Sequence, residues 1–180
     1  METNGKYEHS DLNDLVLKLK DADGHYARIS KRVQFIYWAL VPIYLVIIIL
    51  DVVNNISLAD IGSSLFYLMG MTVFALIFRS YYKEYNFVDY TQSTLIMLKK
   101  AARRYYPCQG KVWLVVLGLI CIDAGLTLRS PFFIEIVKLQ IIFWGAMFGA
   151  VLVGLFVWWV RYKPLRDEAL RLIRDIETYS

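Results

Sequence analysis

Four long apolar stretches restrict the fold of this chain more than any other feature of its sequence. They are Val33–Val53, Ile61–Phe78, Val112–Leu128 and Leu139–Val160. A helix needs about 20 mostly apolar residues to cross roughly 30 Å of hydrocarbon, and each stretch comes close to that length. The chain has 180 residues, of which 58% are hydrophobic, so the core of one soluble domain cannot hide all four. We therefore predict an all-α integral membrane protein with four transmembrane helices arranged as two hairpins.

The basic residues are distributed unevenly around these stretches. Six precede the first, none lies between the first and second, seven lie between the second and third, two lie before the fourth and five follow it. Since Lys and Arg near span ends stay in the cytoplasm, we predict a multi-pass protein of the cell inner (plasma) membrane with both termini cytoplasmic. The first stretch is too long for a cleavable signal peptide, so we expect an uncleaved anchor. The predicted segments are an N-terminal helix (1–32), a first hairpin (33–78), a linker helix (79–111), a second hairpin (112–160) and a C-terminal helix (161–180).

The N-terminal segment carries apolar residues at alternating steps of three and four. We expect a helix that starts near Ser10 and has an association seam formed by Leu15, Leu19, Tyr26 and Ile29. This spacing is typical of a heptad seam, although the soluble part is short for an independent coiled coil. Two interpretations follow: the seam packs on the protein's own cytoplasmic segments or lipid headgroups, or it joins two copies of the chain.

The linker segment predicts a second amphipathic helix. It would start at Asp89 or Thr91 and end at Pro107 with Gly110. Its apolar stripe is Leu95, Leu98, Ala102 and Tyr105, and the opposing face is Lys99, Lys100, Arg103 and Arg104. A basic amphipathic helix binds anionic headgroups at the membrane interface, or it packs within a small cytoplasmic subdomain. The four basic residues are therefore candidates for binding lipid or a partner.

A third amphipathic helix is expected after the last span, beginning near Pro164. Its apolar stripe is Leu165, Ala169, Leu172 and Ile176, with charged residues around it. Short helices gain most of their stability from packing an apolar face, so we expect the three cytoplasmic helices to pack on one another.

Asp123 is the candidate functional acid within the spans. Counted from Lys111, it lies about 18 Å along its helix, near or just beyond the bilayer midplane. An ionised carboxylate at that depth costs at least about 2.5–3.5 kcal/mol, so Asp123 should be protonated, paired or hydrated. Arg129 and Lys138 are the nearest candidate partners. The alternatives are a proton- or cation-binding acid, and a structural carboxyl bonded to Ser, Thr or Gln140 of a neighbouring span.

Small residues in the fourth stretch predict close helix packing. Gly145 and Gly149 lie four apart, and Ala150 and Gly154 lie four apart on a second rail. Such spacing lets helix backbones approach closely in lipid. The contact is either within the chain or between two copies.

No enzymatic motif is visible in the sequence. It has no phosphate-binding glycine loop, nucleophile elbow or HExxH, so we expect no catalytic residue and no cofactor. Two cysteines and two histidines far apart in sequence give neither a disulfide framework nor a metal site. The net charge of +4 reflects basic residues beside the spans, so we expect anionic lipid rather than nucleic acid as their partner.

Several short strings resemble a family of small uncharacterised bacterial inner-membrane proteins. They are Tyr82-Lys83, Val88-Asp89-Tyr90, Leu98-Lys99-Lys100-Ala101, Arg103-Arg104-Tyr105 and Arg161-Tyr162-Lys163-Pro164-Leu165-Arg166-Asp167. The similarity extends from about Lys31 onward. It implies a bacterial four-span protein with no assigned activity, and it supplies no catalytic residues.

The sequence thus supports two main functional hypotheses, ahead of a third, a membrane enzyme that acts on lipid at the cytoplasmic face. The first is a non-enzymatic membrane-anchored scaffold or regulatory protein that presents its cytoplasmic helices to itself, to a partner protein or to anionic lipid. The alternative is a small transporter or ion-conducting oligomer that uses Asp123.

Overall fold

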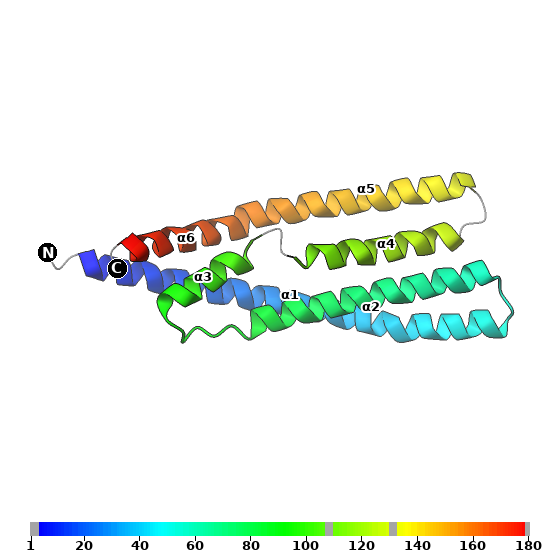
Figure 1. The fold of residues 1–180 in the computed structure, drawn as a ribbon, viewed down its shortest axis with the longest axis horizontal. Helices are drawn as coiled ribbons and strands as arrows, with labels where there is room; N and C mark the ends of the chain where they lie inside the picture. Colours follow the sequence, from blue (N-terminus) through cyan, green and yellow to red (C-terminus); the bar gives the residue numbers. More distant parts are fainter. Residues whose placement is uncertain (1–3, 107–109, 130–132, 179–180) are drawn as a thin grey trace. The chain divides into compact units, whose positions relative to one another are not determined.

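A computed structural model of the chain is all-helical over the residues that it describes, namely 4–106, 110–129 and 133–178 (Figure 1). The elements are α1 (Asn4–Val53), α2 (Leu58–Asn86), α3 (Thr94–Arg104), α4 (Val112–Arg129), α5 (Phe133–Val157), a π-helical turn η1 (Trp158–Tyr162) and α6 (Lys163–Thr178). The chain forms two compact units. The first contains Met1–Ala27, Glu84–Pro107 and Leu152–Ser180, and the second contains Arg28–Lys83 and Cys108–Val151.

Among the described residues, four helical segments are long and apolar enough to cross a membrane. They are Leu12–Val53, Leu58–Asn86, Val112–Arg129 and Ile136–Thr178, and each contains one of the predicted apolar stretches. The prediction of an all-helical chain with four potential spans is therefore confirmed.

The turn between α1 and α2 has an asparagine in the left-handed backbone region. Asn55 has φ 53°, and Ile56 and Asn55 donate backbone bonds to Asp51 and Val52. This is the Schellman pattern, which satisfies the last carbonyls of a helix and favours Gly or Asn at that position. Ser57 then caps α2 by accepting a bond from the Asp60 N–H at 3.2 Å.

Within the second unit, glycines let α2 and α4 approach closely. A Cβ on Gly70 would lie 2.9 Å from Ile122 and 3.2 Å from the Gly118 carbonyl. A Cβ on Gly125 would lie 3.1 Å from the Ser63 carbonyl. The Ser63 hydroxyl, which is fully buried, donates a 2.8 Å bond to the Gly125 carbonyl. Close backbone approach and a polar bond between helices are the two contributions that stabilise helix pairs in lipid.

The glycines of α5, unlike those of α2 and α4, make no close contact with another helix in the described part of the chain. A Cβ on Gly145, Gly149 or Gly154 would have no neighbour within 4 Å, and Ala150 is exposed. The expected small-residue contact within the chain therefore lies between α2 and α4 instead of on α5. Association of two copies through these α5 positions stays a prediction.

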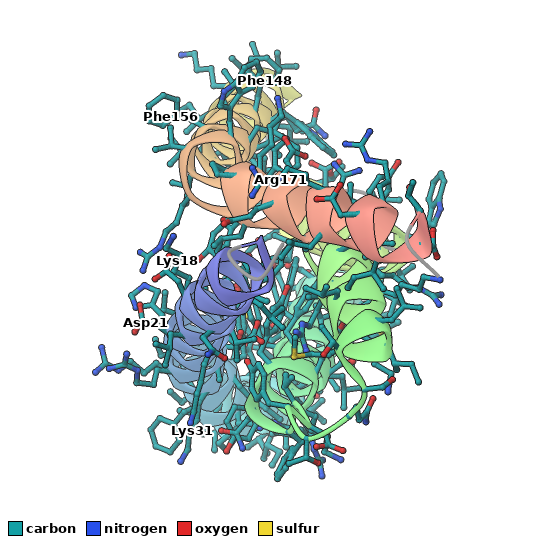
Figure 2. The ribbon with its side chains drawn as sticks, turned by 90° about the vertical axis from the view of Figure 1, so that its left-hand side faces the viewer. Lys18, Asp21, Lys31, Phe148, Phe156 and Arg171 are labelled. Carbon is teal, nitrogen blue, oxygen red and sulfur yellow. The ribbon has the colours of Figure 1, made fainter. Side chains whose placement is uncertain are left out.

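In the first unit, α3 packs against α6, and the start of α1 lies beside both helices (Figures 1 and 2). Figure 2 shows Lys18 and Asp21 on the side of α1 that faces away from α3. The aliphatic side chains buried in this unit include Leu15, Leu19, Ala22, Met97, Leu98, Ala101, Ala102, Leu165, Ala169 and Ile173. Seven of the twelve residues expected in the three stripes are thus buried, whereas Tyr26, Leu95, Leu172 and Ile176 are partly exposed and Ile29 is exposed.

Two predicted helix starts are corrected by the structure. Helix α1 begins at Asn4, so Ser10 lies inside it rather than capping it. Helix α3 begins at Thr94, because the Asp89 carboxylate accepts bonds from the Thr91 N–H at 2.9 Å and hydroxyl at 2.6 Å, which makes a turn instead. Pro107, expected to end α3, lies outside the described residues.

Replacing Gly125 with Val should destabilise the α2–α4 pair, whereas the same change at Gly149 should not. At Gly125 the side chain would meet the Ser63 carbonyl and the Tyr67 ring, and overpacking costs typically about 1–3 kcal/mol. Thermal unfolding in detergent measures both variants, and an equal loss at Gly149 would show that helix propensity, not the close contact, is responsible.

Candidate functional site

A buried carboxylate lies at the centre of the first unit. Asp23 in α1 is only 2% exposed, and it occupies the helix face of Leu19 and Tyr26, four residues after one and three before the other. Its position on an apolar face requires partners, because an unpaired charge there would be very costly.

Three donors satisfy this carboxylate. Arg104 at the end of α3 places its Nη2 3.0 Å from Asp23 Oδ2 and is itself 8% exposed. The Tyr90 hydroxyl donates to Oδ2 and the Tyr105 hydroxyl to Oδ1, each at 2.6 Å. We call Asp23, Tyr90, Arg104 and Tyr105 the Asp23 cluster. It joins α1, the connection between α2 and α3, and the end of α3.

The pKa shifts in the cluster follow from burial. Burial raises the pKa of Asp23, while the Arg104 guanidinium and the two phenol bonds act in the opposite direction. Burial also raises the pKa of Tyr90 and of Tyr105, and the nearby Asp23 carboxylate adds to the increase. Both phenols therefore keep their protons at neutral pH and act as donors.

Aromatic rings enclose the cluster. Tyr26 stacks on Tyr85 with a centroid distance of 4.6 Å and meets Tyr162 edge-on at 5.2 Å. Tyr105 stacks on Tyr162 at 5.7 Å. The Arg104 guanidinium lies 6.0 Å from the ring centroids of Tyr85 and Tyr105, within cation–π range. These rings keep water from the ion pair and give it the low dielectric surroundings that strengthen its attraction.

Side chains from α2 and η1 also satisfy the carbonyls at the end of α3. The Tyr85 hydroxyl donates a 3.2 Å bond to the Arg104 carbonyl, and the Trp158 indole donates a 2.9 Å bond to the Tyr105 carbonyl. The last carbonyls of a helix lack intrahelical partners, so these bonds complete the end of α3. The π-helical turn contributes both Trp158 and Tyr162 to this region. Such turns occur frequently at functional sites.

The predicted association seam is mostly internal. Leu15 and Leu19 have no exposed surface and Tyr26 belongs to the aromatic enclosure, whereas Ile29 is 44% exposed. In this structure the seam is covered by the protein's own segments, which favours the first of the two interpretations drawn from the sequence.

The predicted basic face of α3 is divided by the structure. Lys99 pairs with Glu177 of α6 at 2.6 Å, Lys100 donates to Gln92 at 2.6 Å, and both are exposed together with Arg103. Arg104 does not belong to that face, which corrects the prediction, because pairing with Asp23 places it in the interior.

Asp123 has a carboxylate oxygen without a partner. Its Oδ1 is buried and makes no hydrogen bond to the described part of the chain. Gln140 donates to the Thr127 hydroxyl at 3.1 Å instead, and no ion pair of Asp123 with Arg129 or Lys138 is present among described residues. Asp51 contrasts with it, since it accepts a 2.9 Å bond from the buried Ser64 hydroxyl.

The sequence-based reasoning did not identify Asp23 as a site residue. One signal was available: Asp23 shares the apolar face of α1, and Arg104 shares a face with Met97 and Ala101. An acid on one apolar face and a base on another are candidates for a buried pair, because each needs the other's charge there.

The Asp23 cluster holds three segments of the chain together through one ion pair and two hydrogen bonds. Donors from three residues occupy both oxygens of Asp23. Within the described residues no group of three or more His, Cys, Asp or Glu could hold a metal ion.

No family model matches the chain, and comparisons with curated proteins and with solved structures give no match. Function is therefore inferred from the geometry.

Replacing Arg104 with Met should destabilise the first unit strongly. It leaves Asp23 buried without its cation, and breaking a buried pair from one side costs about 3–5 kcal/mol. The double variant Asp23→Leu/Arg104→Met should recover much of that loss, since no charge is then left in the interior. The stability of both variants is measured by unfolding in detergent, with proteolysis of the segment around Tyr90 as the readout.

The exposed pair of Lys99 and Glu177 provides the control. Lys99→Met should change the free energy of unfolding by about 1 kcal/mol or less, because surface ion pairs contribute little. An Arg104→Met loss no larger than this would mean that the Asp23 cluster does not hold the unit together.

Proposed function

We propose that the chain is a multi-pass protein of a bacterial inner membrane, with its spans in two hairpins and both termini in the cytoplasm. The uneven distribution of Lys and Arg supports this orientation. Cation–π contacts at the basic ends of the spans agree with it: Lys111 lies 4.6 Å from the Tyr81 ring, and Lys163 lies 4.6 Å from the Trp159 ring. The cytoplasmic part is then formed by the three amphipathic helices, which belong to the first unit.

The proposed role is that of a non-enzymatic membrane-anchored scaffold or regulatory protein. The observation that carries it is the buried pair of Asp23 and Arg104. Burying two charges costs desolvation energy that apolar residues would avoid, so a buried pair contributes more to a defined geometry than to stability. Here it holds segments from three parts of the sequence in one arrangement, as a preformed docking surface requires.

The surface available for docking is the charged exterior of α3 and α6. Lys100, Arg103, Arg171 and Arg174 are exposed there, with Asp175 and Glu177 among them. Mixed charge that is fixed in position favours recognition of a partner with complementary charges. The partner classes are a cytoplasmic protein, a second copy of the chain, and anionic headgroups.

Site-specific photo-crosslinking in intact cells tests this role. A crosslinking amino acid at Arg103 or Arg171 should give a discrete protein product, and one at Lys138, on the opposite side of the membrane in this proposal, should not give the same product. A product of twice the chain mass identifies a second copy. Arg104→Met should abolish the product at unchanged membrane level, because the surface loses its geometry.

Two results would contradict the scaffold role. One is a product that persists in full when Arg104 is replaced. The other is an absence of protein products at both positions on the α3 and α6 exterior.

A second candidate function is proton or cation transport through Asp123. The buried Oδ1 without a partner favours it, because a carboxyl in a span needs a ligand, a proton or water. If Asp123 carries transport, Asp123→Asn should abolish ion or proton flux into liposomes while the protein stays folded. Asp51→Asn is the matched control, because that carboxylate already has the Ser64 hydroxyl as a partner. Unchanged flux and unfolding temperature in Asp123→Asn would end the transport hypothesis.

A further inference from the structure

A stripe of exposed side chains runs along α3, on the side of the helix away from its buried residues. Ile96, Lys99, Lys100 and Arg103 recur at steps of three, one and three, so they share one helix face. All four are exposed, and so is Tyr106, which follows two residues after α3 ends. We call these five residues the exposed α3 stripe. Three basic residues form its centre, and one apolar or aromatic residue lies at each end.

Neighbouring side chains orient two of the basic residues. Lys99 pairs with Glu177 of α6 at 2.6 Å, so its charge is balanced. Lys100 donates a 2.6 Å bond to the Gln92 amide oxygen, and because Gln92 is uncharged this bond does not neutralise Lys100. Arg103 takes part in no ion pair among the described residues. The stripe therefore presents Lys100 and Arg103 as positive charges that a partner can neutralise.

The two ends of the stripe offer contact area without charge. Ile96 is 50% exposed and Tyr106 is 48% exposed. The Tyr106 N–H donates a 3.2 Å bond to the Arg103 carbonyl, and the Arg166 guanidinium lies 5.2 Å from the Tyr106 ring centroid. Side chains that are already fixed lose less entropy on binding, and Tyr and Arg are enriched at the positions that dominate interface energetics. This combination is typical of a protein interface.

The burial of the other face of α3 argues against a membrane as the occupant. A helix that lies in the membrane interface inserts its apolar face below the headgroups. Here Leu98, Ala101 and Ala102 are buried within the first unit, so that face has no surface left to insert. Stable attachment to a bilayer needs an apolar signal in addition to basic residues. The stripe therefore fits a protein better than a lipid surface.

A second copy of the chain is also a poor match for the stripe. In a two-fold symmetric dimer the same patch meets itself, which would place Lys100 and Arg103 opposite like charges. Like charges across an interface suppress association, whereas opposite charges favour it. The surface that complements this stripe is consequently acidic.

We propose that the exposed α3 stripe docks an acidic segment of a cytoplasmic protein. Carboxylates of the partner lie at Lys100 and Arg103, where the guanidinium can hold one carboxylate through two parallel bonds. Apolar side chains of the partner meet Ile96 and Tyr106. This proposal rests on the scaffold role, and it names the chemistry of the partner that the α3 and α6 exterior receives.

Photo-crosslinking from Ile96 of the full-length protein in intact cells tests the partner's chemistry. A crosslinking amino acid at this position should give one discrete product with a different protein. Mass spectrometry should show that the partner peptide attached at Ile96 carries net negative charge. The double variant Lys100→Glu/Arg103→Glu should lower the product about ten-fold, because carboxylates would then face carboxylates. Its membrane level and unfolding temperature should match those of the wild type.

A charge reversal elsewhere on the first unit provides the control. Lys20 is an exposed cation of α1 outside the stripe, so Lys20→Glu should change the product less than two-fold, whereas Arg103→Glu alone should lower it several-fold. Replacing the acids of the attached partner peptide with Lys should restore the product in the Lys100→Glu/Arg103→Glu variant. Such a rescue requires direct contact between the two sets of charges.

Several results would overturn the proposal, and they are distinct from failure of the scaffold role. A product that persists in Lys100→Glu/Arg103→Glu but is lost in Arg104→Met would leave the scaffold role intact and exclude acidic recognition. An equal effect of Lys20→Glu would indicate diffuse attraction. A product of twice the chain mass would assign the stripe to a second copy, and lipid adducts alone would assign it to the membrane. Protein products from Arg171 but none from Ile96 would place the docking surface elsewhere on α6.

Discussion

The ion pair between Asp23 and Arg104 is the constraint on which the first unit depends. The two residues are 81 positions apart, and both are buried. Displacing either α1 or α3 would leave a charge buried without its partner, which costs more than the loss of an apolar contact of similar size. The tyrosine hydroxyls at 2.6 Å add direction to this attraction. Apolar surfaces can slide past one another, but a carboxylate with three donors fits in one position.

The second unit is held together in a different way, as expected for helices long and apolar enough to cross a membrane. Lipid is as apolar as the side chains of a span, so helices gain nothing from burying leucine. The α2–α4 contact relies on Gly70, Gly118 and Gly125. At each glycine, atoms of the facing helix occupy the space that a side chain would need. Helix α5 has glycines without such neighbours, and none of the described residues from Ile136 to Val157 is buried. Close approach therefore depends on a complementary surface opposite each glycine as well as on the glycine itself.

This difference explains which features were predictable from the sequence. The spans were predictable because they depend on length and apolarity alone, and the buried stripes around Leu19, Leu98 and Ala169 because they depend on helical periodicity. The Asp23 cluster was not predictable, because it pairs residues that are far apart in the sequence. The spacing of basic residues around Arg104 is equally consistent with Arg104 lying at the edge of an exposed basic face. The close glycine contacts between α2 and α4 were not predicted from the sequence for a related reason. The regular spacing on α5 gave a strong local signal, whereas Gly70 and Gly118 contact residues 52 and 44 positions away.

The tyrosines connect these two kinds of packing. In the first unit, Tyr90 and Tyr105 supply hydroxyl donors to a buried carboxylate while their rings exclude water. In the second unit, Tyr37 stacks on Phe74 at 5.4 Å and Tyr44 meets Tyr67 at 5.6 Å, which are ring contacts between α1 and α2. At the basic ends of the spans, Tyr81 and Tyr82 hold lysine side chains over their ring faces. A phenol combines a large apolar surface with one polar group, so it can satisfy a partner wherever water is scarce. A chain of 180 residues with 13 tyrosines thus uses one residue type for hydrogen bonds to a buried carboxylate, for ring contacts between apolar helices, and for cation–π contacts with lysine side chains.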